Sequence, residues 1–480
     1  MGRRRTSVGV CEPLNRRQFL RYAGLVASTP LAVRAFGVGP AKAFNAVAAN
    51  AVPMHLELVT VTDTTATLTW LTADPLKLDS YGRPTPLPAD TVVELGTSPD
   101  TLTRVVDRND STPFHYVELT GLEPGRQYWY RAVSNGLAAT PTQLWPEPPA
   151  TGVFTTLVPP PGALLLTMAW ANDLHIGEMT SGLAYGDSRF PGGGIPPGFP
   201  ADPENPYWRV MARAAVAESK ERGAELLLLN GDLTSEGKPA FMEEAKATFD
   251  AFGTYRTDYF VARGNHDRAH AGAAWESCAP VESNPDYTDC LTDYFFPDGQ
   301  TRFSFDKAGI HFVALDTVDL LTGTGSIPAD EAEWLAADLA DHDGTPTFVF
   351  GHHPISEEGR GTAIGGPGFS LSQADAQRVE EAIADSSVVG VYSGHTHRNK
   401  RTRSAIAPNV PFIELGATKE YPGGYGLVRV YEGGYMVNFH KTKADAARAW
   451  SEQSRGEYLG LYPYYTLGGF ADRNYVVELR

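Results

Sequence analysis

The stretch Tyr259-Phe260-Val261-Ala262-Arg263-Gly264-Asn265-His266-Asp267 joins a short apolar run to a polar tetrapeptide. The apolar run predicts a buried strand, and the residues after it place an amide, an imidazole and a carboxylate at the strand's carboxyl end. Open α/β sheets keep their ligand sites at the carboxyl ends of their strands. The tetrapeptide alone is a weak indication of a site, but other apolar segments of the chain end in the same way.

Four more apolar segments run into residue types that bind metals: Asp173-Leu174-His175-Ile176-Gly177, Gly231-Asp232-Leu233-Thr234, Gly351-His352-His353-Pro354 and Gly394-His395-Thr396-His397. The five clusters contain six of the twelve histidines. Carboxylate, amide and imidazole groups together suit first-row divalent metals, whereas an all-carboxylate set would favour calcium. Residues two apart on an extended segment point the same way, so Asp-x-His and His-x-His can each direct two ligands to one site. Two ions about 3.5–4 Å apart can activate a water and neutralise phosphate charge, which indicates phosphate-ester chemistry.

Between residues 163 and 440, apolar strands alternate with helical stretches, a pattern typical of an α/β domain. The expected strands cover residues 163–171, 225–230, 259–262, 310–315, 346–350 and 388–392. The expected helices cover residues 207–222, 239–251, 328–340 and 372–385, and short antiparallel strands follow between residues 412 and 439. The remaining histidines singled out in the sequence are interpreted as ordinary hydrogen-bonded residues: His115, His311, His353 and His440.

Residues 52–157 predict a separate all-β module, because short segments alternate apolar and polar residues as half-buried antiparallel strands do. The segment Leu122-Glu123-Pro124-Gly125-Arg126-Gln127-Tyr128-Trp129-Tyr130-Arg131 resembles the corner between two strands of fibronectin type III domains. We interpret Trp70, Tyr128 and Tyr130 as core residues in preference to a carbohydrate-binding platform. Pro159-Pro160-Pro161-Gly162 is interpreted as a stiff linker to the α/β region.

The N-terminal segment has the features of a twin-arginine export signal. Arg16-Arg17 precedes a weakly apolar run, and small-residue cleavage sites follow at Ala41-Lys42-Ala43 or Ala46-Val47-Ala48. No later run approaches the roughly 18 apolar residues that a membrane-spanning helix needs. We therefore expect a mature protein without a transmembrane segment, located in the periplasm, on the cell surface or outside the cell.

Charge and cysteine content fit this expectation. The formal net charge is −17, and residues 44–480 hold 32 basic and 56 acidic residues, a formal charge of −24. Such an acidic surface repels nucleic-acid phosphates, so binding of nucleic acid by charge is not expected. Cys278 and Cys290 form an even pair, which in an oxidising compartment indicates a disulfide, with two free thiols as the alternative.

In order and spacing, the five clusters resemble the calcineurin-like metallophosphoesterase family over residues 163–440. The resemblance implies a mixed α/β fold, a four-layer α/β/β/α sandwich, here preceded by the small fibronectin-like β-sandwich. It also implies two transition-metal ions, of manganese, iron or zinc, and a small phosphate ester as substrate. We therefore predict four parts of the chain: a signal at 1–43, the β-sandwich at 52–157, the catalytic domain at 163–445 and a C-terminal extension packed on that domain at 446–480.

The resemblance also implies roles for individual residues. The first ion would be held by Asp173, His175, Asp232 and His397. Asp232 would bridge to the second ion, which would also be held by Asn265, His352 and His395. A hydroxide bridging the ions would be the nucleophile. His266 would contact a phosphoryl oxygen or protonate the leaving group, and Asp267 would orient His266.

Two alternatives stay open. An N-terminal β-sandwich before a dimetal domain is also the layout of purple acid phosphatases, but their first cluster has Gly where His175 stands and a tyrosine ligand where Ser235 stands. These differences favour the phosphodiesterase-like branch of the metallophosphoesterase family, which includes cyclic-nucleotide and general phosphodiesterases. The second alternative is an exported adhesion or binding protein that acts through its β-sandwich. Specificity is expected to come from three inserts, at residues 179–206, 268–300 and 357–370. Each contains one candidate for holding a phosphate or a remote anion: Arg189, Arg268 and Arg360.

Overall fold

The computed structural model describes residues 50–79, 81–142, 151–182, 198–271, 277–362, 369–457 and 462–479. The predicted export signal at residues 1–43 and the candidate anion-binding Arg189 lie outside these residues. Among the described residues, none of the helices is long and apolar enough to cross a membrane.

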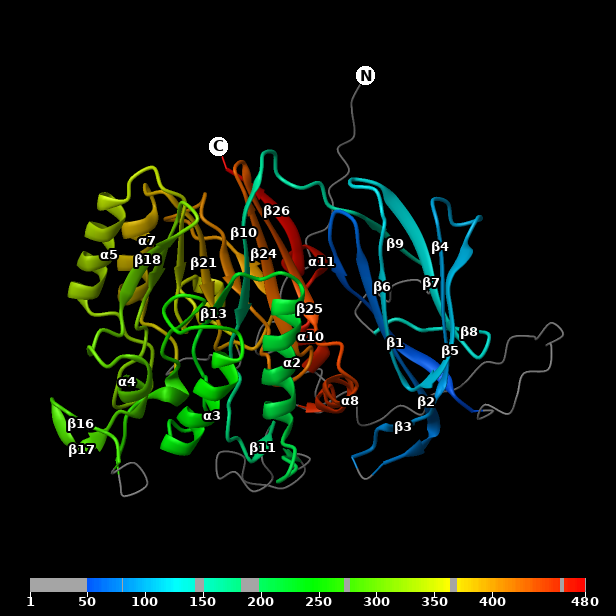
Figure 1. The fold of residues 1–480 in the computed structure, drawn as a ribbon, viewed down its shortest axis with the longest axis horizontal. Coiled ribbons are helices and arrows are strands. Elements are labelled where there is room, and N and C mark those ends of the chain that lie inside the picture. The colour runs from blue at the N-terminus through cyan, green and yellow to red at the C-terminus, as the bar shows by residue number, and fades with distance from the viewer. Residues whose placement is uncertain are drawn as a thin grey trace. The chain divides into compact units, whose positions relative to one another are not determined.

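The N-terminal module is a sandwich of two antiparallel sheets (Figure 1). The first sheet contains β1 (Val52–Val61), β2 (Ala66–Leu78), β3 (Pro84–Pro86) and β6 (Phe114–Leu119). The second contains β4 (Ala89–Gly96), β5 (Thr103–Thr112), β7 (Gln127–Ser134), β8 (Leu137–Ala138) and β9 (Gly152–Thr155). Trp70, Tyr128 and Tyr130 are buried in one hydrophobic cluster, which confirms that they are core residues. At the predicted corner, Glu123 N donates to Tyr128 Oη over 3.0 Å.

The α/β region is built on two six-stranded sheets. In spatial order, the first sheet contains β14 (Tyr259–Val261), β13 (Leu226–Leu229), β10 (Leu164–Ala171), β24 (Gly424–Tyr431), β25 (Gly434–Lys441) and β26 (Asn474–Glu478). The second contains β18 (Phe303–Lys307), β19 (Ile310–Ala314), β20 (Thr347–Phe350), β21 (Val388–Ser393), β23 (Phe412–Glu414) and β22 (Lys400–Thr402). Strands β10, β13 and β14 are parallel to one another, as are β19, β20, β21 and β23.

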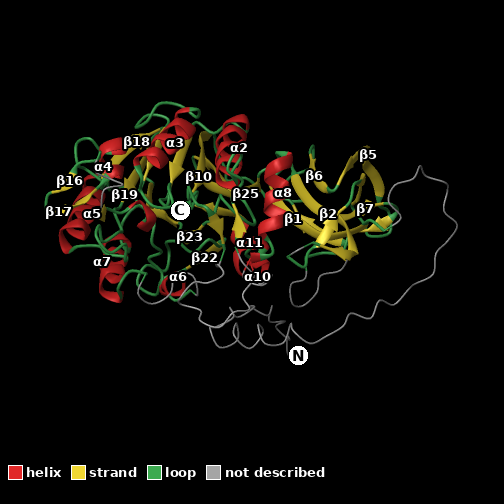
Figure 2. Ribbon diagram, turned by 90° about the horizontal axis from the view of Figure 1, so that it is seen from below, coloured by secondary structure: helices red, strands yellow, loops and turns green. Residues whose placement is uncertain are grey.

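Helices cover the outer faces of both sheets, and the inner faces pack on each other (Figure 2). The first sheet is covered by α2 (Tyr207–Glu221), α3 (Pro239–Asp250) and α8 (Asp445–Ser454). The second is covered by α5 (Ala329–Asp341) and α7 (Gln373–Ile383). Trp170 of β10 stacks on Tyr392 of β21 between the sheets, with ring centroids 4.2 Å apart. The predicted four-layer α/β/β/α arrangement is therefore confirmed.

Short elements complete the described chain. They are β11 (Thr180–Ser181), β12 (Phe199–Pro200), η1 (Asn265–Asp267), β15 (His270–Ala271), β16 (Pro280–Val281), β17 (Asn284–Thr288), α4 (Cys290–Phe295), α6 (Glu357–Arg360), α10 (Tyr462–Thr466) and α11 (Phe470–Arg473). The predicted disulfide between Cys278 and Cys290 is present. The C-terminal extension at residues 446–480 was predicted only to pack on the catalytic domain. Its last strand, β26, in fact pairs with β25 and is part of the first sheet.

The sandwich is attached to the α/β region mainly through β1. Thr60 Oγ1 donates to Phe439 O over 2.6 Å, and Asn474 Nδ2 donates to Val59 O over 3.0 Å. An ion pair joins Glu118 of β6 to Arg222, next to the end of α2, with 2.7 Å between oxygen and nitrogen. These contacts bury polar groups of both modules, so the sandwich is fixed to the catalytic region by paired groups.

Of the four histidines interpreted as structural, three are buried with hydrogen bonds. Both ring nitrogens of His115 contact threonine hydroxyls, those of His311 contact carboxylates, and His353 Nδ1 contacts Thr317. His440 differs, because it is buried but neither of its ring nitrogens has a hydrogen-bond partner in the described part of the chain. Burial therefore lowers the pKa of His440 well below its ordinary value.

Glu331, in the first turn of α5, predicts a pH dependence of stability. Burial, reinforced by the charge of Asp316, raises the pKa of Glu331 to about 8, above the ordinary glutamate value that it regains on unfolding. Stability from this group is therefore fully present below about pH 4.5 and is lost as the pH rises toward 8.

We expect Glu331→Gln to raise the melting temperature by about 2–4 °C at pH 8 and to have almost no effect at pH 4.5. Glutamine keeps an oxygen for the Asp316 N–H group, which donates to Glu331 Oε1 over 2.7 Å. Thermal unfolding by circular dichroism across this range measures the effect, and a gain that does not change with pH would contradict it.

Candidate metal centre

The predicted site residues meet at one edge of the two sheets, where parallel strands end. They follow β10 (Asp173, His175), β13 (Asp232), β14 (Asn265, His266, Asp267), β20 (His352) and β21 (His395, His397). Gly264 allows the close approach of two of these loops, since a Cβ atom there would collide with the backbone N of Asp232. The structure therefore brings all nine predicted residues together.

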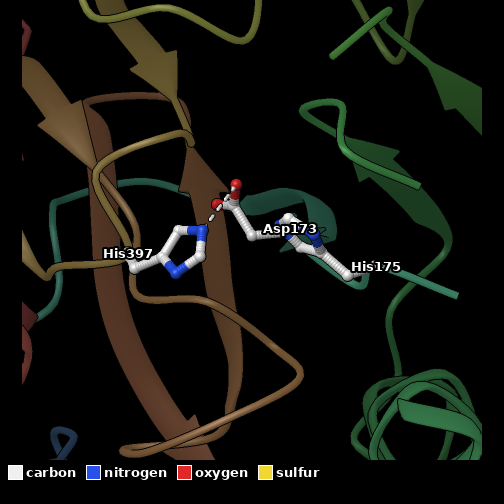
Figure 3. A group of neighbouring side chains, drawn as sticks. All are labelled: Asp173, His175 and His397. Atoms are coloured by element: carbon white, nitrogen blue, oxygen red, sulfur yellow. Dashed lines mark ion pairs between the residues drawn. The ribbon is translucent and has the colours of Figure 1, made fainter. Parts of the chain in front are cut away.

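The first group consists of Asp173, His175 and His397, whose candidate ligand atoms lie within 4.8 Å of one another (Figure 3). His397 Nε2 lies 3.4 Å from Asp173 Oδ1. Asp232 joins this group through its Oδ2, which lies 3.5 Å from His175 Nε2. All four side chains are buried.

The second group consists of Asp232, Asn265, His352 and His395. His352 Nε2 lies 3.3 Å from Asp232 Oδ2 and 2.8 Å from Asn265 Oδ1. His395 Nδ1 lies 2.9 Å from Asn265 Oδ1 and 3.2 Å from His352 Nε2. His352 Nδ1 donates to Asn230 O over 2.9 Å, which in the neutral ring leaves Nε2 without a proton. Asp232 is the residue common to both groups.

The donor set fits metal ions. Ligands about 2.1 Å from a shared ion are separated by roughly 3.0–3.4 Å in octahedral or tetrahedral geometry. The contacts in the two groups, between 2.8 and 3.5 Å, lie close to this range. His175 is buried, yet neither of its ring nitrogens has a hydrogen-bond partner among the described residues. A buried imidazole without a hydrogen bond is costly, and a bond to a metal would compensate this cost. Carboxylate, amide and imidazole donors are compatible with manganese, iron or zinc.

Five of the candidate ligands adopt a left-handed backbone conformation that residues other than glycine rarely adopt. Their φ angles lie between 46° and 66°: Asp173, His175, Asp232, His395 and His397. Each such residue costs on the order of 1–3 kcal/mol and persists only where its surroundings enforce it. Here the loops are held to each other, since Asp173 N donates to Gly231 O and His175 N donates to Asp232 O. Half of the ten non-glycine residues with positive φ in the described chain are therefore candidate ligands.

His266 lies beside the two groups. Its backbone N donates to Asp232 Oδ1 over 2.8 Å, and its ring centroid lies 4.5 Å from that of His175. Its Nδ1 donates to Ser235 O over 2.8 Å. Because Nδ1 is occupied in this way, Nε2 is the ring nitrogen available to a substrate.

The predicted role of Asp267 needs a correction. Its carboxylate does not contact the ring of His266, which is oriented by the carbonyl of Ser235. Instead, Asp267 accepts hydrogen bonds from the backbone N atoms of Leu233, Thr234 and Gly264 and from the Thr234 hydroxyl. Burial and the charge of Asp232 raise the pKa of Asp267 to about 6, although these hydrogen bonds oppose the shift. Asp267 therefore ties the loop after β13 to η1 and acts on His266 only through that loop.

Glu420 is a residue of the site that was not predicted from the sequence. Its Oε1 lies 2.5 Å from His397 Nδ1, and its Oε2 accepts from Ser181 Oγ. Burial lowers the pKa of His397, but the charges of Asp173 and Glu420 outweigh burial and raise that pKa to about 10. The neighbouring Lys419 contacts both carboxylate oxygens of Glu178 at 2.6 Å. One sequence feature could have indicated Glu420. The charged pair Lys419-Glu420 stands just before Tyr421-Pro422-Gly423, a turn within the segment expected to form antiparallel strands.

A further group of possible ligands lies at the other end of β19. It consists of Asp306, His311 and His342. Both ring nitrogens of His311 already contact carboxylates, of Asp306 at 2.8 Å and of Asp338 at 2.7 Å. The rings of His311 and His342 are stacked, with centroids 3.6 Å apart and an interplanar angle of 14°. Stacked rings direct their lone pairs along parallel lines and not toward one shared ion. We therefore interpret this group as an ion-pair cluster.

The two described arginines from the inserts are half-buried and bonded to backbone carbonyls. Arg268 Nη1 donates to Asn265 O over 3.2 Å, and Arg360 Nε donates to Ile355 O over 3.1 Å. Arg268 is thus next to a candidate metal ligand.

Comparison with known proteins gives the class of this domain. Residues 167–399 match the model of the calcineurin-like phosphoesterase family. The chain therefore contains a calcineurin-like phosphoesterase domain, and that family consists of metal-dependent phosphoester hydrolases. Together with the two residue groups, the family match implies a two-metal centre.

Similar individual proteins were also found. The chain is 28% identical, over 192 residues, to a Synechococcus protein named "Probable cyclic nucleotide phosphodiesterase"; the match covers 39% of this chain and 63% of that protein. A dimetal phosphatase from Danio rerio is 14% identical, with a TM-score of 0.41 and coverage of 58% of this chain and 98% of that one. A purple acid phosphatase from yellow lupin (Lupinus luteus) seeds is 14% identical, with a TM-score of 0.39 and coverage of 82% and 72%.

Metal analysis tests the site. We expect the purified chain to bind about two transition ions after reconstitution with manganese, iron or zinc, and Asp232→Asn to retain less than one, because the shared carboxylate charge is lost. Mass spectrometry of the elements in the protein measures the stoichiometry.

His342→Gln is the matched control, since it removes a histidine from the ion-pair cluster at the other end of β19. It should leave the metal content unchanged. Loss of an ion in this variant would contradict our interpretation of that cluster, and full metal content in Asp232→Asn would contradict the two-group site.

Proposed function

We propose that the chain is an exported dimetal phosphoesterase of the phosphodiesterase-like branch, acting on a small phosphate ester. The observation that carries the proposal is the position of Asp232. Its Oδ2 lies within 3.5 Å of His175 Nε2 and 3.3 Å of His352 Nε2, so one carboxylate can serve two ions. The ions would supply an activated water and neutralise the charge of the phosphate.

The residues of the chain would divide the remaining work. Asp173, His175 and His397 would hold one ion, and Asn265, His352 and His395 the other, with Asp232 between them. His266 keeps its Nδ1 proton on Ser235 O, so its Nε2 would contact a phosphoryl oxygen or, when protonated, give its proton to the leaving oxygen. All the candidate metal ligands are buried, and this burial would exclude bulk water from the reacting atoms.

Two observations favour the phosphodiesterase-like branch over a purple acid phosphatase-like phosphomonoesterase. The first cluster contains His175 at the candidate ligand position, and Ser235 stands where the tyrosine ligand would be required. Ser235 has no phenol oxygen, and its backbone carbonyl accepts a hydrogen bond from His266 Nδ1. The relative named as a cyclic nucleotide phosphodiesterase supports the same branch.

Export is supported by the twin-arginine pattern and by the disulfide between Cys278 and Cys290, since such bonds persist in oxidising compartments. The alternative of an adhesion protein acting through its β-sandwich has less support. The aromatic side chains that could form a ligand platform, Trp70, Tyr128 and Tyr130, are buried in the core of the sandwich.

A substrate panel tests the branch. We expect faster hydrolysis of bis(p-nitrophenyl) phosphate and 2′,3′- or 3′,5′-cyclic nucleotides than of p-nitrophenyl phosphate, measured as kcat/KM in the same metal. A preference for the monoester would favour the purple acid phosphatase-like alternative. Absence of turnover with every ester, in protein that carries two ions, would contradict a phosphoesterase.

His266→Ala tests the proton-transfer residue. We expect kcat to fall by about 10²–10⁴-fold while the metal content stays at the wild-type value, because His266 is not assigned to an ion. Ser235→Ala is the matched control. It keeps the carbonyl that orients His266, so its kcat should stay within about threefold of wild type. Loss of metal in His266→Ala would mean that His266 is a ligand.

A further inference from the structure

Glu57 is a buried carboxylate that the β-sandwich directs into the catalytic region. It lies on β1 and is only 4% exposed. Thr142 Oγ1 donates to its Oε1 from within the sandwich, over 2.7 Å. Its other partners come from the catalytic region: Tyr421 Oη donates to Oε1 over 2.5 Å, Lys441 Nζ donates to Oε2 over 3.0 Å, and Arg455 Nη2 also donates to Oε1.

This arrangement keeps Glu57 ionised. Burial alone would raise the pKa of Glu57, but the charges of Arg455 and Lys441 outweigh burial and hold that pKa well below its ordinary value. A buried carboxylate is tolerated only when charges and hydrogen bonds compensate it, and here two cations and two hydroxyls do so. Glu57 thus fixes the positions of Tyr421 and Arg455.

Tyr421 connects Glu57 to the metal centre. It is fully buried and directly follows Glu420, whose Oε1 lies 2.5 Å from His397 Nδ1. The other ring nitrogen of His397 lies 3.4 Å from Asp173 Oδ1, in the first ligand group. A path of two short contacts, joined by the peptide bond between Glu420 and Tyr421, therefore leads from the sandwich to a candidate metal ligand.

Helix α8 also holds this segment. Trp450 Nε1 donates to Lys419 O over 2.6 Å, and Tyr421 N donates to Ser454 Oγ over 2.9 Å. The sandwich also secures the end of this helix, because Arg83 Nη1 donates to Gln453 O over 3.1 Å. The segment 419–421 is therefore held both by α8 and by the sandwich.

We propose that Glu57 is a positioning residue for the metal centre, and that the β-sandwich serves to hold His397 in place through Tyr421 and Glu420. The inference rests on the proposed function, because it takes His397 as a metal ligand. Carboxylates that hydrogen-bond a metal-ligating histidine orient the ring and increase its basicity. Glu57 acts one step further out, by orienting the segment that carries that carboxylate.

The test compares Glu57→Gln with wild type and with Glu118→Gln. Glutamine keeps the size of Glu57 and an oxygen for Tyr421 but removes the charge that pairs with Lys441 and Arg455. Glu118 is the matched control, since it also joins the sandwich to the catalytic region, through Arg222. Within the described part of the chain, these contacts do not lead to a candidate ligand. Metal affinity is measured by titrating each reconstituted protein with a chelator, and melting temperatures are recorded in parallel.

We expect Glu57→Gln to release one of its two ions at about tenfold lower chelator concentration than wild type. Its kcat should fall at limiting metal and recover in excess metal, with KM unchanged. Glu118→Gln should lower the melting temperature without changing either metal affinity or kcat. If Glu57→Gln does not fold, Tyr421→Phe removes only the hydroxyl contact to Glu57 and should show the same shift in metal affinity in a smaller degree.

Wild-type metal affinity in both Glu57→Gln and Tyr421→Phe would overturn the inference, and so would an equal loss of affinity in Glu118→Gln. If the proposed function is wrong, the wild-type chain itself will bind fewer than two ions or hydrolyse no phosphate ester. The two failures can therefore be told apart in one set of proteins.

Discussion

The carboxylate of Asp232 is the group on which the whole site depends. It is the member shared by the two ligand groups, and its Oδ1 also receives the backbone N–H group of His266. Burial would raise the pKa of Asp232, but the charges of His352 and His266 outweigh burial and hold that pKa well below its ordinary value. The negative charge is therefore kept in the interior, where two metal ions would be its natural counterpart.

The fold supplies this carboxylate with a rigid support. Asp232 follows β13, whose four leucines are all buried and which lies between two parallel neighbours in its sheet. The second sheet contributes His352, His395 and His397 from its own strand ends. The packed inner faces fix the positions of the two sheets relative to each other. Strained backbone at the ligand positions is stable only on such a support, because a looser loop would relax to an ordinary conformation.

Sequence alone predicted the parts of this structure that depend on local patterns. The strands and helices of the α/β region quoted above end within two residues of their predicted limits. The candidate ligands could be found because each stands directly after an apolar strand, and parallel strands end at a common edge. Glu420 could not be found in this way, since its contact with His397 spans 23 residues and depends on a turn with no strand pattern. The hydrogen-bond partners of Asp267 could not be predicted either. A carboxylate two residues after the ligand Asn265 can contact either His266 or the backbone of a neighbouring loop.

The strand β26 has a consequence for how the molecule gains its stability. The partners of β1 include Asn474, so the first described strand is held in place by a residue from the last one. Contacts so far apart in the chain cannot form before nearly all of it is present, and they join the two modules once they do form. The sandwich and the catalytic region should therefore unfold in a single cooperative transition, and the sandwich should not behave as an interchangeable module.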